Sequence, residues 1–160
     1  MAKRLSELLQ AIGIKTESDI LIEGITDRYQ EVKKNWLYFA IKGEHVDGYE
    51  FRHAVLNQGG IIVSDHQEDT EGYFHPCIRI AFAFCVHAFY DYPCKKMKCI
   101  GITGTNGKSS VATLIRQILK KMNIECMQIG TEGITLFDET TYTGNTTPNI
   151  LTCVRHLDKA

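Results

Sequence analysis

Residues 101–110, GITGTNGKSS, have the types and spacing of a loop that binds phosphate. Glycine lets the backbone curl so that successive N–H groups face inward at phosphate oxygens. In such loops a lysine reaches the terminal phosphates of a nucleotide and the next hydroxyl ligates Mg²⁺, roles that fall here to Lys108 and Ser109. The general pattern G-x-x-x-x-G-K-[ST] needs glycine at 102, where this chain has Ile102. The rival interpretation is a glycine-rich turn followed by a fortuitous Lys-Ser pair.

The elements needed to position this loop are expected on both sides of it. Residues 99–103 are predicted to form a short buried strand. After the loop, apolar residues at 111, 114, 115, 118, 119 and 122 have the spacing of a helix that buries one face. The helix N-terminus would add its partial positive charge to the loop. With another strand over 125–129, the segment is predicted to be a parallel β-α-β unit with a right-handed crossover.

The rest of the chain predicts an α/β fold. The expected strands are 20–26, 36–41, 61–64 and 134–137, and the expected helices are 5–12, 49–57 and 79–90. Residues 43–48 and 66–74 are predicted loops. The helix over 79–90 is apolar nearly all round, so we expect burial on more than one side, with Phe82, Phe84 and Phe89 in the core or between domains. A last helix is predicted to begin at Thr147 as N-cap, with Pro148 as its first residue.

Composition excludes several classes of protein. The 18 Lys and Arg residues against 19 Asp and Glu give a net charge of −1, so there is no basic field for nucleic acid. The longest apolar run, residues 80–90, is too short to cross a bilayer, and the N-terminus lacks the apolar core of a signal peptide. The six cysteines form no C-x-x-C pair, which favours reduced cytosolic thiols over disulfides or zinc. We therefore expect a cytoplasmic, globular protein without nucleic-acid binding or membrane insertion, and a monomer.

Four stretches resemble one family. Residues 103–109, TGTNGKS, are similar to the TGTNGK[ST] loop of the Mur ligases, the ATP-dependent ligases of peptidoglycan synthesis. Residues 37–51, 88–93 (AFYDYP) and 145–148 (NTTP) resemble the tripeptide synthetases of this family, which add the third residue of the stem peptide. The match covers essentially the whole chain, in the right order. It implies a UDP-sugar-binding domain over 1–94, then the first part of a P-loop, parallel-sheet ATP-binding domain over 95–160.

The resemblance also implies a reaction and its site residues. The ligases use ATP and Mg²⁺ to convert the D-glutamate carboxylate of UDP-N-acetylmuramoyl-L-alanyl-D-glutamate into an acyl phosphate, which an amino acid then attacks. Lys108 is the implied catalytic residue and Ser109 the implied metal ligand. The residues expected to bind ATP are Gly104, Thr105, Asn106, Gly107, Lys108, Ser109 and Ser110. The residues expected to bind the substrate are Glu44, His45, Val46, Asn145, Thr146 and Thr147.

The chain departs from the family pattern in three ways. The family's D-S-R motif appears as residues 28–30, with Tyr29 in place of serine, and we expect Tyr29 to pack against the sheet instead. Ser110 stands where threonine is usual. The chain ends before the acidic Mg²⁺ ligand, the modified lysine and the C-terminal domain, so alone it is expected not to complete the ligation. The main alternative is a truncated, non-catalytic nucleotide-binding or regulatory paralogue; a folate or poly-amino-acid ligase is a second one.

Overall fold

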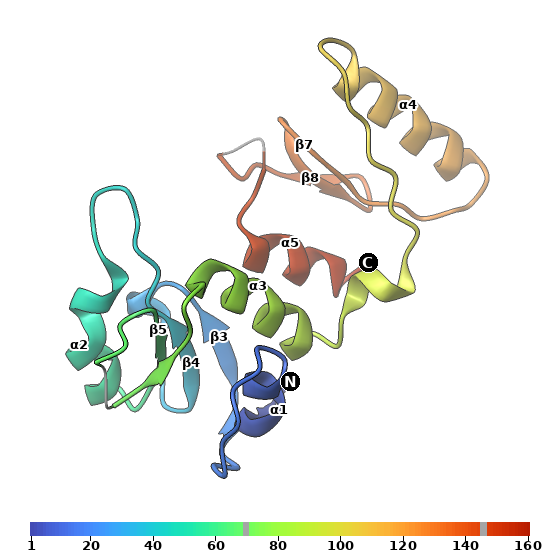
Figure 1. Ribbon diagram of the computed structural model, residues 1–160. Helices are drawn as coiled ribbons and strands as arrows, with labels where there is room; N and C mark the ends of the chain where they lie inside the picture. The colour runs from blue at the N-terminus through green and yellow to red at the C-terminus, as the bar shows by residue number, and fades with distance from the viewer. Residues whose placement is uncertain (69–70, 145–146) are drawn as a thin grey trace. The chain divides into compact units, whose positions relative to one another are not determined.

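The computed structural model describes residues 1–68, 71–144 and 147–160. The chain divides into two compact units, Met1–Asp91 and Tyr92–Ala160 (Figure 1). Both units combine helices with strands, and the first contains a parallel sheet, so the predicted α/β class is confirmed. No helix in the described part of the chain is long and apolar enough to cross a membrane.

A four-stranded parallel sheet forms the centre of the first unit. Its strands lie side by side in chain order: β3 (Gly24–Thr26), β4 (Trp36–Phe39), β5 (Ile61–Ser64) and β6 (Tyr73–Phe74). A two-stranded antiparallel ribbon of β1 (Lys3–Arg4) and β2 (Leu21–Ile22) precedes it in the chain. The predicted strand over 20–26 is therefore divided between two sheets, and the predicted polar loop over 66–74 ends in the short strand β6.

Helices cover both faces of this sheet because its side chains alternate between them. Toward one face, the ring of Phe39 lies 5.1 Å from that of Phe82 on α3 (Ile78–Phe89). Cys85 of the same helix donates from Sγ to the backbone oxygen of Leu8 on α1 (Leu5–Gln10), at 3.2 Å. On the other face, α2 (Arg52–Asn57) contributes to a cluster that consists of Val32, Tyr38, Ala40, Val55 and Ile62.

The helix α3 differs from its prediction in how it is buried. Phe82 and Phe89 are buried, whereas Ile80 and Phe84 remain 56% and 53% exposed. The buried positions follow one stripe of the helix, so the expectation of burial on several sides is wrong. The prediction failed because it counted every aromatic residue of the helix as buried, whereas Phe84 is exposed.

The only tryptophan of the chain fixes the first two strands of the parallel sheet. Trp36 on β4 is the register partner of Gly24 on β3. An ideal Cβ at Gly24 would lie 2.3 Å from the Trp36 ring, so any larger residue would displace the indole. Lys33 completes this contact from another side, with its Nζ 5.9 Å from the ring centroid.

The second unit consists of helices and a three-stranded antiparallel sheet. Its elements are the 3-10 helix η3 (Pro93–Lys96), α4 (Lys108–Lys121), β7 (Gln128–Gly130), β8 (Gly133–Leu136), β9 (Glu139–Thr141) and α5 (Ile150–Leu157). At the β8–β9 turn, Asp138 forms ion pairs with Arg116 and Lys120 of α4, the first at 3.2 Å. These pairs join the hairpin to the helix.

Two predictions for the second unit are wrong. Residues 99–103 are not a strand: they have no ladder partner in the described part of the chain, and most of their side chains are exposed. The parallel β-α-β crossover from residues 99–103 to 125–129 is absent, because its first strand does not form and β7 pairs only with β8 in the described part of the chain. Only residues 131 and 132 separate β7 from β8, and so short a link makes this pair an antiparallel hairpin.

Candidate functional site

The predicted phosphate loop curls into the start of a helix. Gly104 has φ +154° and Gly107 has φ +77°, values that side-chain-bearing residues rarely adopt. Helix α4 begins at Lys108, and its first bond runs from the Val111 N–H to the Gly107 oxygen at 2.9 Å. No side chain caps this N-terminus. Its first-turn N–H groups therefore have no intrahelical acceptor, which is what an anion at a helix start requires.

Lys108 folds back over the loop. Its Nζ donates to the Gly104 oxygen at 2.7 Å and to the Thr105 oxygen at 3.4 Å. The ammonium charge therefore stays beside the loop instead of extending into solvent. Helix and lysine together make the loop an electropositive site, although the chain as a whole is nearly neutral.

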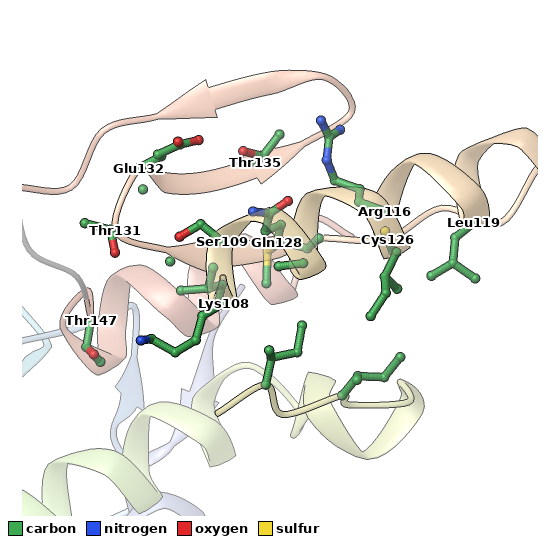
Figure 2. Close-up of a pocket in the computed structure, with 18 of the residues that line it drawn as sticks. Lys108, Ser109, Arg116, Leu119, Cys126, Gln128, Thr131, Glu132, Thr135 and Thr147 are labelled. Carbon is green, nitrogen blue, oxygen red and sulfur yellow. The ribbon is translucent and has the colours of Figure 1, made fainter. Parts of the chain in front are cut away.

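A cavity of about 370 Å³ lies beside the start of α4 (Figure 2). Polar groups from four segments line it, among them Lys98 before the loop, Lys108 and Ser109 from α4, Glu132 from the β7–β8 hairpin, and Thr147 from the segment before α5. Apolar side chains such as Ile115 and Ile129 line the remainder. Cavities of this size accept small-molecule ligands. The structure thus places Thr147 on the same cavity as Lys108 and Ser109.

Thr147 is not the cap of the last helix. Asn149 is the N-cap of α5, and its Oδ1 accepts from the Thr152 N–H at 2.8 Å. The prediction of Thr147 as N-cap and Pro148 as first helical residue is therefore wrong, because asparagine two residues later caps as well as threonine does. The Thr147 hydroxyl is left for the cavity. The other two predicted residues of this segment, Asn145 and Thr146, lie outside the described residues.

The sequence analysis missed the hairpin side of the cavity. Thr131 and Glu132 occupy the turn between β7 and β8, and both line the same cavity as Ser109 (Figure 2). The spacing Gly130…Gly133 marks a tight turn directly after a predicted strand. That signal was available, because loops that follow strands are where ligands bind in α/β folds.

The oxygen donors around Ser109 are chemically suited to Mg²⁺. This ion prefers hard oxygen ligands and usually keeps several waters while binding substrate phosphates. A hydroxyl at Ser109 and a carboxylate at Glu132 in one cavity fit that preference. Within residues 1–68, 71–144 and 147–160, no three His, Cys, Asp or Glu side chains gather where they could hold a metal by themselves.

The predicted sugar-nucleotide loop lies in the first unit, after the carboxyl end of β4. The loop over 43–46 closes through a 2.9 Å hydrogen bond from the Gly43 N–H to the Val46 oxygen. At its base, the backbones of Lys42 and Asp47 form an antiparallel β-bridge. The side chains of Glu44, His45 and Val46 are exposed. Parallel sheets bind ligands at this edge. The structure therefore presents these three side chains to solvent on a short, closed loop.

Gly48 and Tyr38 hold this loop in place. The Tyr38 hydroxyl donates to the Gly48 oxygen at 2.9 Å. A Cβ at Gly48 would lie 2.8 Å from the Ile41 oxygen and 2.9 Å from the Tyr38 hydroxyl, so glycine is required there. Burial, aided by the nearby carboxylate of Asp27, raises the pKa of Tyr38 to about 12. The hydroxyl therefore remains a donor over the whole physiological range.

Tyr29 takes a packing role, as expected from its chemistry. Its ring stacks on Phe51 with centroids 3.8 Å apart and planes 9° from parallel. It also packs against the cluster under α2. A serine at this position could offer a hydroxyl to a ligand. The Tyr29 ring instead connects the segment between β3 and β4 to the segment between β4 and β5, through its contact with Phe51.

Comparison with known families agrees with this geometry. Residues 102–160 match the Mur ligase middle domain. The chain is 32% identical to the UDP-N-acetylmuramoyl-L-alanyl-D-glutamate--L-lysine ligase of Staphylococcus haemolyticus, with 97% of the chain and 33% of the relative aligned. It is 35% identical to the corresponding 2,6-diaminopimelate ligase of Listeria monocytogenes, over 93% of the chain and 32% of the relative. The chain thus spans about a third of the length of the curated relatives it matches.

Solved structures show the same fold. A UDP-N-acetylmuramoyl-L-alanyl-D-glutamate--2,6-diaminopimelate ligase superposes with a TM-score of 0.73 over 99% of this chain and 33% of that one, at 19% identity. A crystal structure of MurF from Acinetobacter baumannii superposes with a TM-score of 0.54 over 76% of this chain and 28% of that one.

Proposed function

This chain belongs to the Mur ligase family, and from that premise we propose that it holds the sugar-nucleotide substrate and the ATP phosphates of a peptidoglycan precursor ligase. The reaction adds the third stem-peptide residue to UDP-N-acetylmuramoyl-L-alanyl-D-glutamate. The relatives at 32% and 35% identity carry names of this reaction, with lysine or 2,6-diaminopimelate as the amino acid. A diamino acid is therefore the proposed second substrate.

The observation that carries this proposal is the shared cavity at the start of α4. Lys108 and Ser109 line it together with Thr147, which comes from the segment that resembles the family's muramoyl-peptide contact. A phosphate donor and a carboxylate acceptor must meet within reach of one another for phosphoryl transfer. A cavity with phosphate-binding groups on one wall and a free hydroxyl on another supports that meeting.

The proposed chemistry has two balanced steps. The D-glutamate carboxylate oxygen attacks the γ-phosphorus of ATP, the bond to the β–γ bridging oxygen breaks, and ADP leaves. The amino group of the diamino acid then attacks the acyl phosphate carbon, inorganic phosphate leaves, and the nitrogen loses a proton. Lys108 and the loop N–H groups Gly104–Ser110 stabilise the charge that moves onto the phosphate oxygens.

Ser109 is the proposed protein ligand of Mg²⁺ at the nucleotide. A bound Mg²⁺ would supply neutralisation of the phosphate charge and fix the geometry of the transferring group. The Ser109 hydroxyl is in the cavity, next to the helix start, which is where a metal on the β- and γ-phosphates would be reached.

The proposed contact with the UDP end of the substrate is the exposed loop Glu44–Val46. Its backbone is closed by the Gly43–Val46 hydrogen bond, and Arg79 of α3 donates to the Lys42 oxygen at 2.6 Å. A loop fixed at both ends can present side chains at low entropic cost. Because the proposed substrates are soluble precursors, we place the protein in the cytoplasm.

A thermal melt of the whole chain tests both ligands. We would record it alone, with MgATP, and with UDP-N-acetylmuramoyl-L-alanyl-D-glutamate. A ligand at about 100 times its dissociation constant should add about 2.7 kcal/mol to the unit that binds it. Stabilisation by both ligands supports the ligase proposal. A cooperative melt that neither ligand shifts would contradict it and favour a non-catalytic relative.

A further inference from the structure

Glu132 stands out among the described residues that line the cavity, because it is their one acidic side chain. The others include the basic residues Lys98, Lys108 and Arg116. A carboxylate beside a loop built for polyphosphate works against binding unless something lies between them, because like charges in a protein cavity repel strongly. Its presence therefore needs an explanation.

The backbone holds Glu132 firmly at this place. Gly130 and Gly133 are register partners on either side of the turn, and the next pair brings in the fully buried Ile134. Gly133 has φ +111°, and a Cβ there would lie 2.2 Å from the Thr141 oxygen of β9. The three-stranded sheet thus fixes the turn.

The carboxylate of Glu132 is not neutralised by its neighbours. Within the part of the chain that the structure describes, it has no hydrogen bond and no ion pair. Two of the three cations that line the cavity are engaged elsewhere: Lys108 with carbonyls of its own loop, and Arg116 with Asp138 at 3.2 Å. The third, Lys98, forms no ion pair with Glu132. The Glu132 carboxylate and the Ser109 hydroxyl therefore line one cavity without a partner of their own among the described residues.

We propose that Glu132 binds the divalent cation that accompanies the nucleotide, directly or through a water molecule, together with Ser109. This rests on the proposed function, because the cation comes with ATP. Magnesium in nucleotide sites is usually bound by one or two carboxylates, water and phosphate oxygens, and Glu132 supplies such a carboxylate. A cation between Glu132 and the phosphates would attract both, and would so replace their mutual repulsion with two favourable contacts.

The test measures how strongly Mg²⁺ and ATP favour each other's binding. Calorimetric titration of ATP into the whole chain would be done in EDTA and again in excess Mg²⁺, for the native chain, Glu132→Gln and the control Glu139→Gln. Glu139 is exposed on β9 of the same sheet and does not line the cavity. In Glu132→Gln we expect metal-free ATP to bind about tenfold more tightly and the advantage from Mg²⁺ to fall about tenfold. Glu139→Gln should match the native chain.

A Mn²⁺ titration followed by electron paramagnetic resonance, with ADP bound, gives a second measurement that does not depend on catalysis. Weaker Mn²⁺ binding in Glu132→Gln alone supports the proposal. An unchanged Mg²⁺ advantage and unchanged Mn²⁺ binding in that variant would overturn it while leaving the nucleotide site intact. If the native chain bound no ATP with or without Mg²⁺, the proposed function itself would fail. Thermal melts confirm that both variants fold.

Discussion

Lys108 is the side chain on which the proposed nucleotide binding should depend most. Its ammonium group already contacts two carbonyl oxygens of its own loop, and it is exposed. Lys108→Ala should therefore weaken ATP binding about 100-fold, the loss expected for charge-assisted hydrogen bonds to phosphate. The melting temperature without ligand should not change, since no core contact is lost. Equal ATP affinity in the variant and the native chain, measured by calorimetry, would contradict the assignment.

Thr147 and Asn149 separate ligand binding from helix capping. Asn149→Ala removes the acceptor for the Thr152 N–H and should cost about 1 kcal/mol of unfolding free energy in urea. Thr147→Ala should leave stability nearly unchanged and reduce affinity for the UDP-muramoyl dipeptide. The two variants act as controls for each other. A stability loss in Thr147→Ala equal to that in Asn149→Ala would mean that the threonine serves the helix after all.

The raised pKa of Tyr38 predicts how the stability of the fold changes at alkaline pH. Its pKa is raised from 10.0 to about 12, chiefly by burial, so the folded chain keeps the proton that the unfolded chain loses first. The stabilising effect is complete below pH 10.0 and is lost as the pH rises to about 12, an effect of about 2 kcal/mol. Urea unfolding of the native chain and Tyr38→Phe across this range checks it. The variant should show a shallower decline, although Cys85, whose pKa burial also raises to about 12, keeps part of it.

Single residues show what sequence can and cannot predict about the site. The phosphate loop follows from its glycines and Lys108, because those residue types carry their geometry with them. The packing of Tyr29 could be expected, since an aromatic ring after a strand favours burial. Glu132 was missed although Gly130 and Gly133 mark its turn, because its place in the cavity depends on the hairpin lying beside α4, a non-local contact that the sequence does not display.

At the scale of elements, Asp138 joins a helix to a hairpin. It binds Arg116 and Lys120, four residues apart on α4, and the hydrogen bond from Lys120 is the main reason that its pKa lies below the usual value. Asp138→Asn should loosen β8 and β9 locally. Hydrogen exchange of the hairpin amides should become faster at low salt, whereas in Glu139→Gln it should not. Unchanged protection in Asp138→Asn would show that the ladder alone holds the hairpin.

Helices with strong periodicity were predictable and short strands were not. Helix α4 contains the apolar positions from 111 to 119 that predicted it, and it begins at Lys108, the last residue of the predicted turn. Residues 99–103 have strand-like composition but lack a partner, and composition cannot supply the hydrogen bonds of a ladder. A strand was expected over 125–129 and forms over Gln128–Gly130, but its partner is β8 across a two-residue turn and not residues 99–103.

At the scale of the molecule, the two units differ in how well they bury apolar surface. The first has cores on both faces of its sheet, whereas no residue of α4 is fully buried and three of its apolar residues are exposed: Val111, Leu114 and Ile118. We therefore expect two unfolding transitions, the second unit melting first. Hydrogen exchange with mass analysis should show α4 amides exchanging at lower temperature than those of β4. MgATP should raise only the lower transition, and a single transition in both segments would contradict this.

The division into units was visible in the sequence only as a change of composition. The turn and three lysines over 91–98 predict a domain boundary after residue 94. In the structure, the boundary between the two compact units falls after Asp91. The parallel sheet of the first unit was predictable from its apolar runs. The antiparallel sheet of the second was not, because the same β-branched residues suit either direction of pairing.

Because of the position of Trp36, the tryptophan fluorescence of the chain comes only from the first unit. The indole is the chain's only one and lies on β4, against Gly24 and within cation–π distance of Lys33. Its fluorescence therefore reports solvent entry into the first unit. Energy transfer from Trp36 to a nucleotide bearing a fluorescent acceptor would, by contrast, give the distance between the sheet of the first unit and the nucleotide in solution. The one tryptophan thus serves as the energy-transfer donor for a distance measurement, without any labelling of the protein.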